Sequence, residues 1–315
     1  MKRFFKLLGV FAVILLLLSV AADCVISSGL RKSNNRLYSV WNDIYDSNIN
    51  PDILIMGSSE CMFGFNTYII DSLLNCNSYN IGVNGHAFPF QLLRYNTYCR
   101  FCYQPKVLII SLSFIDAFAA ARYAFEREQL FPYVWDDSLI DVVSEDMKIT
   151  FFDRYLPYYR YYGYREIIED GVRSFIGKTS STGKELYKGF RSDDYEWNCG
   201  NLRDNIVYQA AVEPEVVSML CGFIRQSEKD GISVVLVEFP EYHPIREVYG
   251  NVLQVERVFD SIAHELQVPL LDYSELDISF DSMNYYDPNH LNTRGSELFT
   301  IRFCHDLDSL KIIQN

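Results

Sequence analysis

The sequence predicts a three-layer α/β sandwich built on a central, mostly parallel sheet of five strands. Five short apolar runs, rich in Val and Ile, alternate along the chain with amphipathic segments. Continuous apolar runs are typical of strands buried on both faces, and their alternation with helices indicates parallel pairing. We therefore expect helices to cover both faces of the sheet.

The elements of this sandwich follow one another in a simple order. We expect strands at 52–56, 78–81, 106–112, 232–238 and 268–272. We expect helices at 68–74, 90–102, 214–230, 252–266 and 294–310. The alternation stops between about 117 and 212, where no clear strand occurs, so we expect a helical insertion there, at the strand ends.

Composition and charge exclude several classes of protein. The chain has 315 residues, of which 49% are apolar and 22% charged, so it can build a core and is not a disordered tail. Its formal net charge is −13. Binding to the phosphate backbone requires clustered Lys and Arg, so this charge argues against a nucleic-acid partner.

The N-terminus predicts export with a retained membrane helix. Lys2, Arg3 and Lys6 precede an uncharged stretch at 7–22, a pattern that favours a cytoplasmic N-terminus and translocation of the rest. We expect a signal anchor at 1–30, with the following domain on the periplasmic or another extracytoplasmic side.

The alternative is a cleaved signal peptide with Ser19 and Ala21 as the small residue pair. After the anchor we expect a polar, helical stalk at 31–50. The main domain is expected at 51–315, and it contains the insertion at about 117–212.

Three loops that follow expected strands or precede the last helix carry chemically useful residues. Gly57-Ser58-Ser59 follows the first strand, where a Ser can expose its hydroxyl and turn its own N–H toward an oxyanion. Asn80-Ile-Gly-Val-Asn84-Gly85 follows the second strand and supplies N–H donors. Each loop alone is also compatible with an ordinary Gly-rich or Ser-rich turn.

The third loop is Asp287-Pro-Asn-His290, just before the last helix. An Asp three residues before a His can orient the imidazole and stabilise its charged form when a serine is deprotonated. The alternative is a simple turn followed by a helix cap.

Together, these three loops resemble the SGNH (GDSL-type) hydrolase superfamily, and the resemblance covers about 52–116 and 232–310. It implies an SGNH/flavodoxin-like fold. It also implies Ser59 as nucleophile, His290 as base and Asp287 as the acid that orients it. The N–H groups of Ser59 and Gly85 would then hold the oxyanion.

The third block of the family pattern departs from expectation. The position at which the superfamily has an oxyanion-binding Asn falls on Ile115, which has no donor side chain. Loss of one such donor is worth on the order of 10²–10³ in turnover. Three alternatives follow: the site is slower, another donor (Ser113 or Asn84) substitutes, or the protein no longer catalyses.

Further candidate substrate contacts lie outside the triad. His243 follows the fourth strand, and Tyr158 and Tyr162 belong to a Tyr-rich stretch that is interrupted by arginines. Aromatic faces suit sugar rings and Arg suits acidic groups, so the stretch is a candidate polysaccharide wall. The alternative is packing of the insertion against the sheet or another chain.

The resemblance to membrane-anchored relatives implies an exported serine esterase or O-acyltransferase that acts on acylated cell-envelope glycans. The rival hypothesis is a catalytically inactive SGNH-like protein that binds glycan or scaffolds envelope-assembly proteins. A third hypothesis, a disulfide oxidoreductase, rests on the spacing of Cys99 and Cys102. We expect no cofactor and no metal, since no second Cys pair and no His pair at zinc spacing accompanies Cys99 and Cys102.

Overall fold

The computed structural model describes residues 1–120, 125–178, 186–197 and 207–312. The chain divides into two compact units, each described here by itself. Unit 1 consists of Met1–Asp43 and Arg122–Glu185, and unit 2 of Ile44–Ala121 and Leu186–Asn315. The predicted insertion at 117–212 therefore contains the second segment of unit 1.

Unit 2 contains a five-stranded sheet in the order β2-β1-β3-β4-β5, and all neighbouring strands are parallel. The strands are β1 (Ile53–Met56), β2 (Ser78–Asn80), β3 (Val107–Leu112), β4 (Ser233–Glu238) and β5 (Leu270–Asp272). All five predicted strands are confirmed, each one or two residues shorter than expected. A separate antiparallel pair, β6 (Tyr285–Asp287) with β7 (His290–Leu291), was not predicted.

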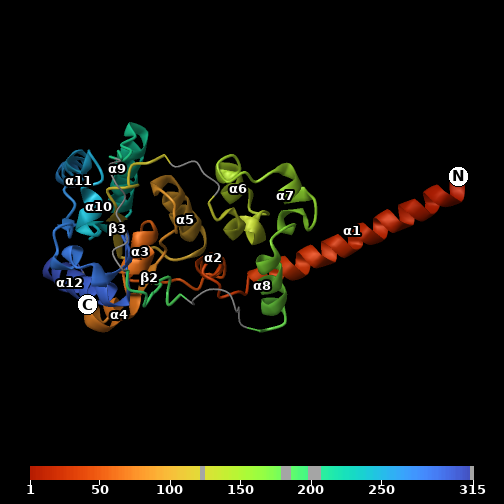
Figure 1. Cartoon of the computed structure of the whole chain (residues 1–315), viewed down its shortest axis with the longest axis horizontal. Coiled ribbons are helices and arrows are strands. Elements are labelled where there is room, and N and C mark those ends of the chain that lie inside the picture. Colours follow the sequence, from red (N-terminus) through yellow and green to blue (C-terminus); the bar gives the residue numbers. More distant parts are fainter. Residues whose placement is uncertain (121–124, 179–185, 198–206, 313–315) are drawn as a thin grey trace. The chain divides into compact units, whose positions relative to one another are not determined.

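Helices cover both faces of this sheet, as predicted. They are α3 (Ser59–Gly64), α4 (Thr67–Leu74), α5 (Phe88–Phe101), α9 (Pro214–Lys229), α10 (His243–Arg246), α11 (Val252–Leu266) and α12 (Thr293–Ser309), with short 3₁₀ turns η3 (Asp277–Phe280) and η4 (Ser282–Asn284). Helices α9 and α11 lie on one side of the sheet, and α4 and α12 on the other (Figure 1). Helix α9 also contacts α5 and α11.

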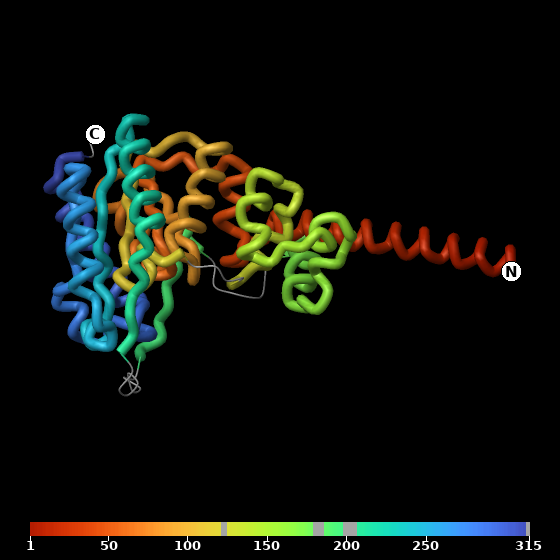
Figure 2. Tube along the Cα trace, turned by 90° about the horizontal axis from the view of Figure 1, so that it is seen from above, coloured from red at the N-terminus to blue at the C-terminus, as the bar shows by residue number. Residues whose placement is uncertain are grey.

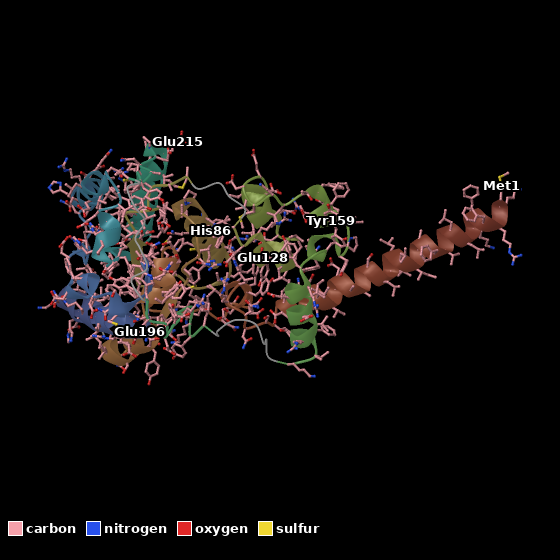
Figure 3. All side chains as sticks on the ribbon, in the orientation of Figure 1. Met1, His86, Glu128, Tyr159, Glu196 and Glu215 are labelled. Carbon is pink, nitrogen blue, oxygen red and sulfur yellow. The ribbon has the colours of Figure 1, made fainter. Side chains whose placement is uncertain are left out.

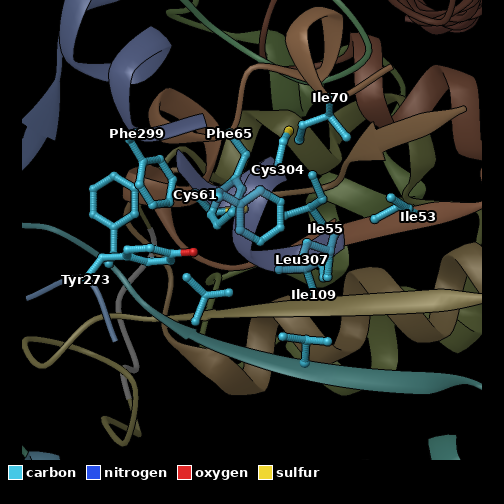
Figure 4. Close-up of a cluster of buried hydrophobic side chains, with 14 of the residues drawn as sticks. Ile53, Ile55, Cys61, Phe65, Ile70, Ile109, Tyr273, Phe299, Cys304 and Leu307 are labelled. Carbon is cyan, nitrogen blue, oxygen red and sulfur yellow. The ribbon is translucent and has the colours of Figure 1, made fainter. Parts of the chain in front are cut away.

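One face of the sheet holds the main hydrophobic core of unit 2. Alternate strand residues, among them Ile53, Ile55 and Ile109, pack there against aromatic side chains of α12 and of the loop after α3 (Figure 4). Phe65 and Phe299 meet edge to face with ring centroids 5.0 Å apart, a favoured aromatic geometry. This packing fixes α12, and with it the loop that precedes α12.

The end of β1 lies where the order in which strands are added to the sheet reverses. The chain passes from β1 to β2 on one side and then to β3 on the other, and ligands of such sheets bind beyond the carboxyl ends at this switch point. Gly57 follows β1 where space is minimal: a Cβ there would lie 2.6 Å from the Cβ of Cys61 and 2.8 Å from that of Ser111. The chain can therefore turn into α3 only with glycine at this position.

Unit 1 is helical. Its elements are α1 (Lys2–Leu30), η1 (Arg127–Tyr133), α6 (Asp137–Val143), α7 (Phe151–Tyr155), η2 (Tyr159–Tyr161) and α8 (Arg165–Phe175), and α2 (Ser39–Tyr45) begins in it. Most of α1 projects beyond the rest of unit 1 (Figures 1 and 2). Within the described residues, α1 is the one helix long and apolar enough to cross a membrane.

The C-terminal turns of α1 belong to the core of unit 1. Ile26 and Leu30 are buried, and α1 crosses α8 so closely that a Cβ on Gly29 would lie 1.7 Å from the carbonyl oxygen of Gly171. Trp41 is also fully buried and donates from Nε1 to Oε1 of Gln129 at 3.0 Å. The exposed and the packed parts of α1 are thus one continuous helix.

The close fit of Gly57 yields a test of unit 2. Gly57→Ala should lower the free energy of unfolding by about 1–3 kcal/mol, because the added methyl group has no space beside Cys61 and Ser111. Chemical denaturation of the full chain in detergent measures this change. The matched control is Gly222→Ala in α9, where a Cβ would meet nothing within 4 Å and Ala is the better helix former. Equal effects of both substitutions would contradict the prediction.

Candidate active site

Ser59 is the first residue of α3, directly after the turn at Gly57. The residue is largely buried, with 9% of its surface exposed. The first N–H groups of a helix have no acceptor within that helix, and the N–H of Ser59 is one of these. The short β1–α3 connection therefore offers a hydroxyl and a backbone donor at the same place.

Three side chains form a continuous chain of hydrogen bonds beside this turn. Oγ of Ser59 lies 2.7 Å from Nε2 of His290. Nδ1 of His290 lies 2.8 Å from Oδ1 and 2.9 Å from Oδ2 of Asp287. If Nδ1 carries the proton, Nε2 is free to accept the proton of Ser59, which is the arrangement required of a general base.

The unpredicted β6–β7 pair explains why Asp287 and His290 meet. The two residues are direct partners across this antiparallel pair, and Pro288 and Asn289 form the turn. The backbone N–H groups of Asn289 and His290 donate to Oδ1 of Asp287 at 2.9 and 3.0 Å. The turn therefore holds the carboxylate in place before it orients the imidazole.

The last helix ties the hairpin to the nucleophile. Asn292 caps α12 by accepting from the N–H of Gly295 at 3.0 Å. Two hydroxyls of α12, those of Ser296 and Thr300, donate to the carbonyl oxygen of Gly64 at the end of α3, at 2.9 and 3.0 Å. The base and the nucleophile thus lie on elements that are bonded directly to each other.

The surroundings of Asp287 favour its ionised form. Burial alone would raise the pKa of this carboxyl, but the hydrogen bond and charge of His290 and the two backbone donors outweigh burial and lower it. Asp287 is therefore a carboxylate at neutral pH and is able to stabilise a protonated His290.

Two aromatic residues that the sequence did not single out hold the His290 ring. Tyr286 stacks on it with centroids 5.3 Å apart, and Phe63 lies 5.1 Å away. The guanidinium of Arg191 lies over the ring of Phe63, 4.8 Å from its centroid. The sequence could have indicated Phe63, because it lies four residues after Ser59 and residues four apart on a helix share a face.

The second block is bonded to the first. The side chain of Asn80 donates to the carbonyl oxygen of Cys61 at 2.8 Å and accepts from the N–H of Gly82 at 2.9 Å. Gly85, the predicted oxyanion donor, has φ +66°, a conformation that glycine adopts without strain. Asn84 and Gly85 are both partly exposed at this turn.

The third block is organised around a buried carboxylate that the sequence did not predict. Glu60, 4% exposed, accepts hydrogen bonds from the hydroxyls of Ser58 and Ser113. Ser113 in turn accepts from the N–H of Ile115 at 3.2 Å. Burial, and after it the charge of Glu60, raises the pKa of the neighbouring Asp116 well above its ordinary value. The Ser113 hydroxyl is therefore engaged with Glu60.

The other predicted contacts lie elsewhere. His243 stacks on Phe280, with centroids 4.5 Å apart, and lines a cavity of about 630 Å³ beyond β4 and β5. The segment just before it reaches the hairpin, where the N–H of Tyr242 donates to the carbonyl oxygen of Pro288 at 3.4 Å. Tyr158 and Tyr162 belong to unit 1, whereas the triad belongs to unit 2.

The thiols of Cys24, Cys61, Cys76, Cys99, Cys221 and Cys304 are free, and Cys199 lies outside the described residues. Burial raises the pKa of Cys99 to about 11, whereas redox-active thiols have lowered pKa values. The raised pKa of Cys99 thus gives no support to the oxidoreductase hypothesis. Among the described residues, no group of three or more His, Cys, Asp or Glu side chains could hold a metal ion.

The sheet order and the helices on both faces confirm the predicted three-layer α/β sandwich around a parallel sheet of five strands. No family model and no curated protein matches the chain. Among solved structures, it is similar to a proposed acylhydrolase from Bacteroides fragilis NCTC 9343, with 10% identity and a TM-score of 0.39 over 83% of this chain and 88% of that chain. It is also similar to a GDSL-like lipase from Bacteroides thetaiotaomicron VPI-5482, with 9% identity and a TM-score of 0.38 over 82% and 88%.

The lowered pKa of Asp287 predicts a specific dependence of stability on pH. The folded chain holds this proton less tightly than the unfolded chain, so the contribution of Asp287 is complete above its usual pKa of 3.8 and is lost as pH falls through the lower folded value. Asp287→Asn should therefore lower the free energy of unfolding above about pH 5 and have less and less effect in stronger acid. Chemical denaturation across this range measures both proteins. A difference that stays constant with pH would contradict the prediction.

Proposed function

We propose that the chain is a serine ester hydrolase or O-acyltransferase. The observation that carries this proposal is the hydrogen-bonded chain of Ser59, His290 and Asp287 at the carboxyl edge of the sheet. Nucleophile, base and orienting carboxylate at these distances are the parts that acyl transfer needs.

The proposed reaction has two stages. His290 takes the proton of Ser59 while Oγ attacks the ester carbonyl, and His290 then gives that proton to the departing alcohol as the acyl–oxygen bond breaks. In the second stage, water or a sugar hydroxyl loses its proton to His290 and attacks the acyl-enzyme. The bond to Oγ then breaks, and Ser59 regains its proton.

The oxyanion of each intermediate needs donors. The N–H groups of Ser59, at the start of α3, and of Gly85, at a turn with φ +66°, are the proposed pair. Ile115 supplies no side-chain donor, and Ser113 is bonded to Glu60. We therefore expect a slower enzyme than a three-donor site would give.

We also propose that α1 anchors the protein in a membrane, with its catalytic unit on the extracytoplasmic side. The helix has 29 residues, and its 18-residue apolar window is only 6% buried. At 1.5 Å per residue the part from Lys2 to Asp23, which precedes the packed turns, is about 33 Å long, enough to cross a hydrocarbon core of about 30 Å. Its continuation into the core of unit 1 favours a retained anchor over a cleaved signal peptide.

The proposed substrate is an acylated cell-envelope glycan. The resemblance to membrane-anchored relatives of the SGNH superfamily implies this class, and an extracytoplasmic enzyme would meet such polymers at the membrane surface. Envelope-assembly proteins are proposed partners on the same grounds.

The second candidate function is a catalytically inactive SGNH-like protein that binds glycan or scaffolds envelope assembly. One specific observation favours it: the third block holds Ile115 at the donor position, and the nearest hydroxyl is occupied. The two candidates share the same fold and anchor and differ in turnover.

Replacement of the nucleophile tests the proposal. Ser59→Ala should reduce hydrolysis of p-nitrophenyl acetate on the order of 10⁴-fold or more and abolish labelling by a fluorophosphonate, because the hydroxyl that is bonded to His290 is removed. The control is Ser261→Ala, an exposed serine on α11. Wild-type turnover in the Ser59 variant would rule out the assignment.

A gain-of-function change separates the two candidates. Ile115→Asn restores the donor type of the superfamily and should raise kcat by up to about 10²-fold if Ile115 faces the oxyanion. Ile115→Leu is the control without a donor. Turnover that appears only in Ile115→Asn would show that the natural chain is inactive; equal rates in the two variants would place position 115 outside the oxyanion site.

A further inference from the structure

Unit 1 exposes a chain of aromatic side chains that the proposed chemistry does not use. Trp135, Phe151, Phe152, Tyr155 and Tyr159 are between 47% and 68% exposed, and together they are called the aromatic rim. Three ring contacts connect four of them: Tyr155 to Phe151 at 4.7 Å, Phe151 to Phe152 at 6.0 Å, and Phe152 to Tyr159 at 5.7 Å. Contiguous exposed apolar surface of this kind marks an interaction site.

The aromatic rim is continuous with the exposed part of α1. Trp135 and Tyr155 line one cavity of about 290 Å³ together with Val20, Asp23 and Cys24 of α1. Tyr159 lies on the side of unit 1 from which the apolar part of α1 projects (Figure 3). The rim therefore begins where the uncharged stretch of α1 ends.

Polar contacts fix the rim at this level of the helix. Asp23 is the first charged residue after the apolar stretch, and its carboxylate is 2.6 Å from Nη2 of Arg160. The other oxygen of Asp23 accepts from the N–H of Tyr158 at 2.8 Å. Tyr161 turns inward and is fully buried, with its hydroxyl 2.8 Å from that of Ser27. The segment that carries the rim is thus bonded to α1 one turn beyond Val20.

We propose that the aromatic rim is a membrane-seating surface, which inserts into the interfacial layer of the lipid bilayer that α1 crosses. This inference rests on the proposed anchoring of α1. Trp and Tyr favour that layer because their rings combine apolar bodies with polar groups. An amphipathic rim fixed to the helix at the level of its first charge would enter the layer as soon as the helix spans the membrane.

The seating surface also accounts for the two kinds of aromatic residue in the 151–164 stretch. The buried member, Tyr161, packs against α1, whereas the rim residues gain little from packing because about half or more of each side chain is exposed. A glycan wall would need no bond between the rim segment and α1. The observed contacts with Asp23 and Ser27 fix the position of the rim segment along the axis of α1.

Quenching by brominated lipids tests the seating. The full chain is reconstituted in phosphatidylcholine vesicles whose lipids carry bromine either near the headgroup or near the bilayer centre. We expect Trp emission to be quenched more by the shallow bromines, and Trp135→Phe to remove at least half of that shallow quenching. The matched control is Trp197→Phe in unit 2, which should leave it unchanged.

A second variant tests the rim without touching the reporter. Replacement of Phe151, Phe152, Tyr155 and Tyr159 together by Ser should cut the shallow quenching of Trp135 by at least half while the melting temperature stays near that of the wild type. The proposal of a membrane-seating surface is wrong if Trp135→Phe and Trp197→Phe change the shallow quenching equally. It is also wrong if the Ser variant is quenched like the wild type.

Extraction with alkaline carbonate separates failure of the rim from failure of the anchor. Release of the full chain from the vesicles would overturn the anchoring by α1 and the seating with it. Retention of the chain in the vesicles without shallow quenching of Trp135 would overturn the seating alone. Retention together with the expected quenching would support both.

Discussion

The hydrogen bond between Ser59 and His290 joins two residues that are 231 positions apart, and every other feature of the site serves it. On one side, β1 and the narrow turn at Gly57 place Ser59 at the start of α3. On the other, α12 packs on the same face of the sheet and bonds to the end of α3. A Cβ on Gly295 would lie 2.1 Å from the carbonyl oxygen of Asn284, so close packing of α12 needs glycine there.

Glu60 gives the site its second organising contact. A carboxylate buried to this extent must be hydrogen-bonded, and the hydroxyls of Ser58 and Ser113 satisfy it from the first and third blocks. The same bonds commit Ser113 to a structural role. Ser113 therefore does not replace the donor that is missing at Ile115, and the proposed oxyanion donors are the backbone N–H groups of Ser59 and Gly85.

Unit 1 depends on a different feature: one helix, α1, is exposed in its N-terminal part and buried in its last turns. The apolar N-terminal part of α1 is exposed, and its last turns are packed against α8 through Gly29 and Gly171. Asp23 marks the change between the two parts, and its ion pair with Arg160 keeps the charge satisfied where the helix enters unit 1. The exposed apolar stretch and the turns that pack in unit 1 are therefore parts of the same helix.

The sequence by itself determined the sheet, because continuous Val- and Ile-rich runs and the helical periods between them are local properties. It also singled out Ser59, Asp287 and His290, since each lies in a short motif with its own chemical meaning. The sequence did not predict the β6–β7 hairpin, the role of Glu60 or the rings around His290. Glu60 and Phe63 act through contacts with distant segments, which a sequence pattern does not show.

Only the tertiary structure decided that the Tyr-rich stretch divides into a buried tyrosine and an exposed rim. The reason is physical: whether an aromatic side chain is core or surface depends on what packs against it, and here that neighbour is α1, more than 130 residues earlier.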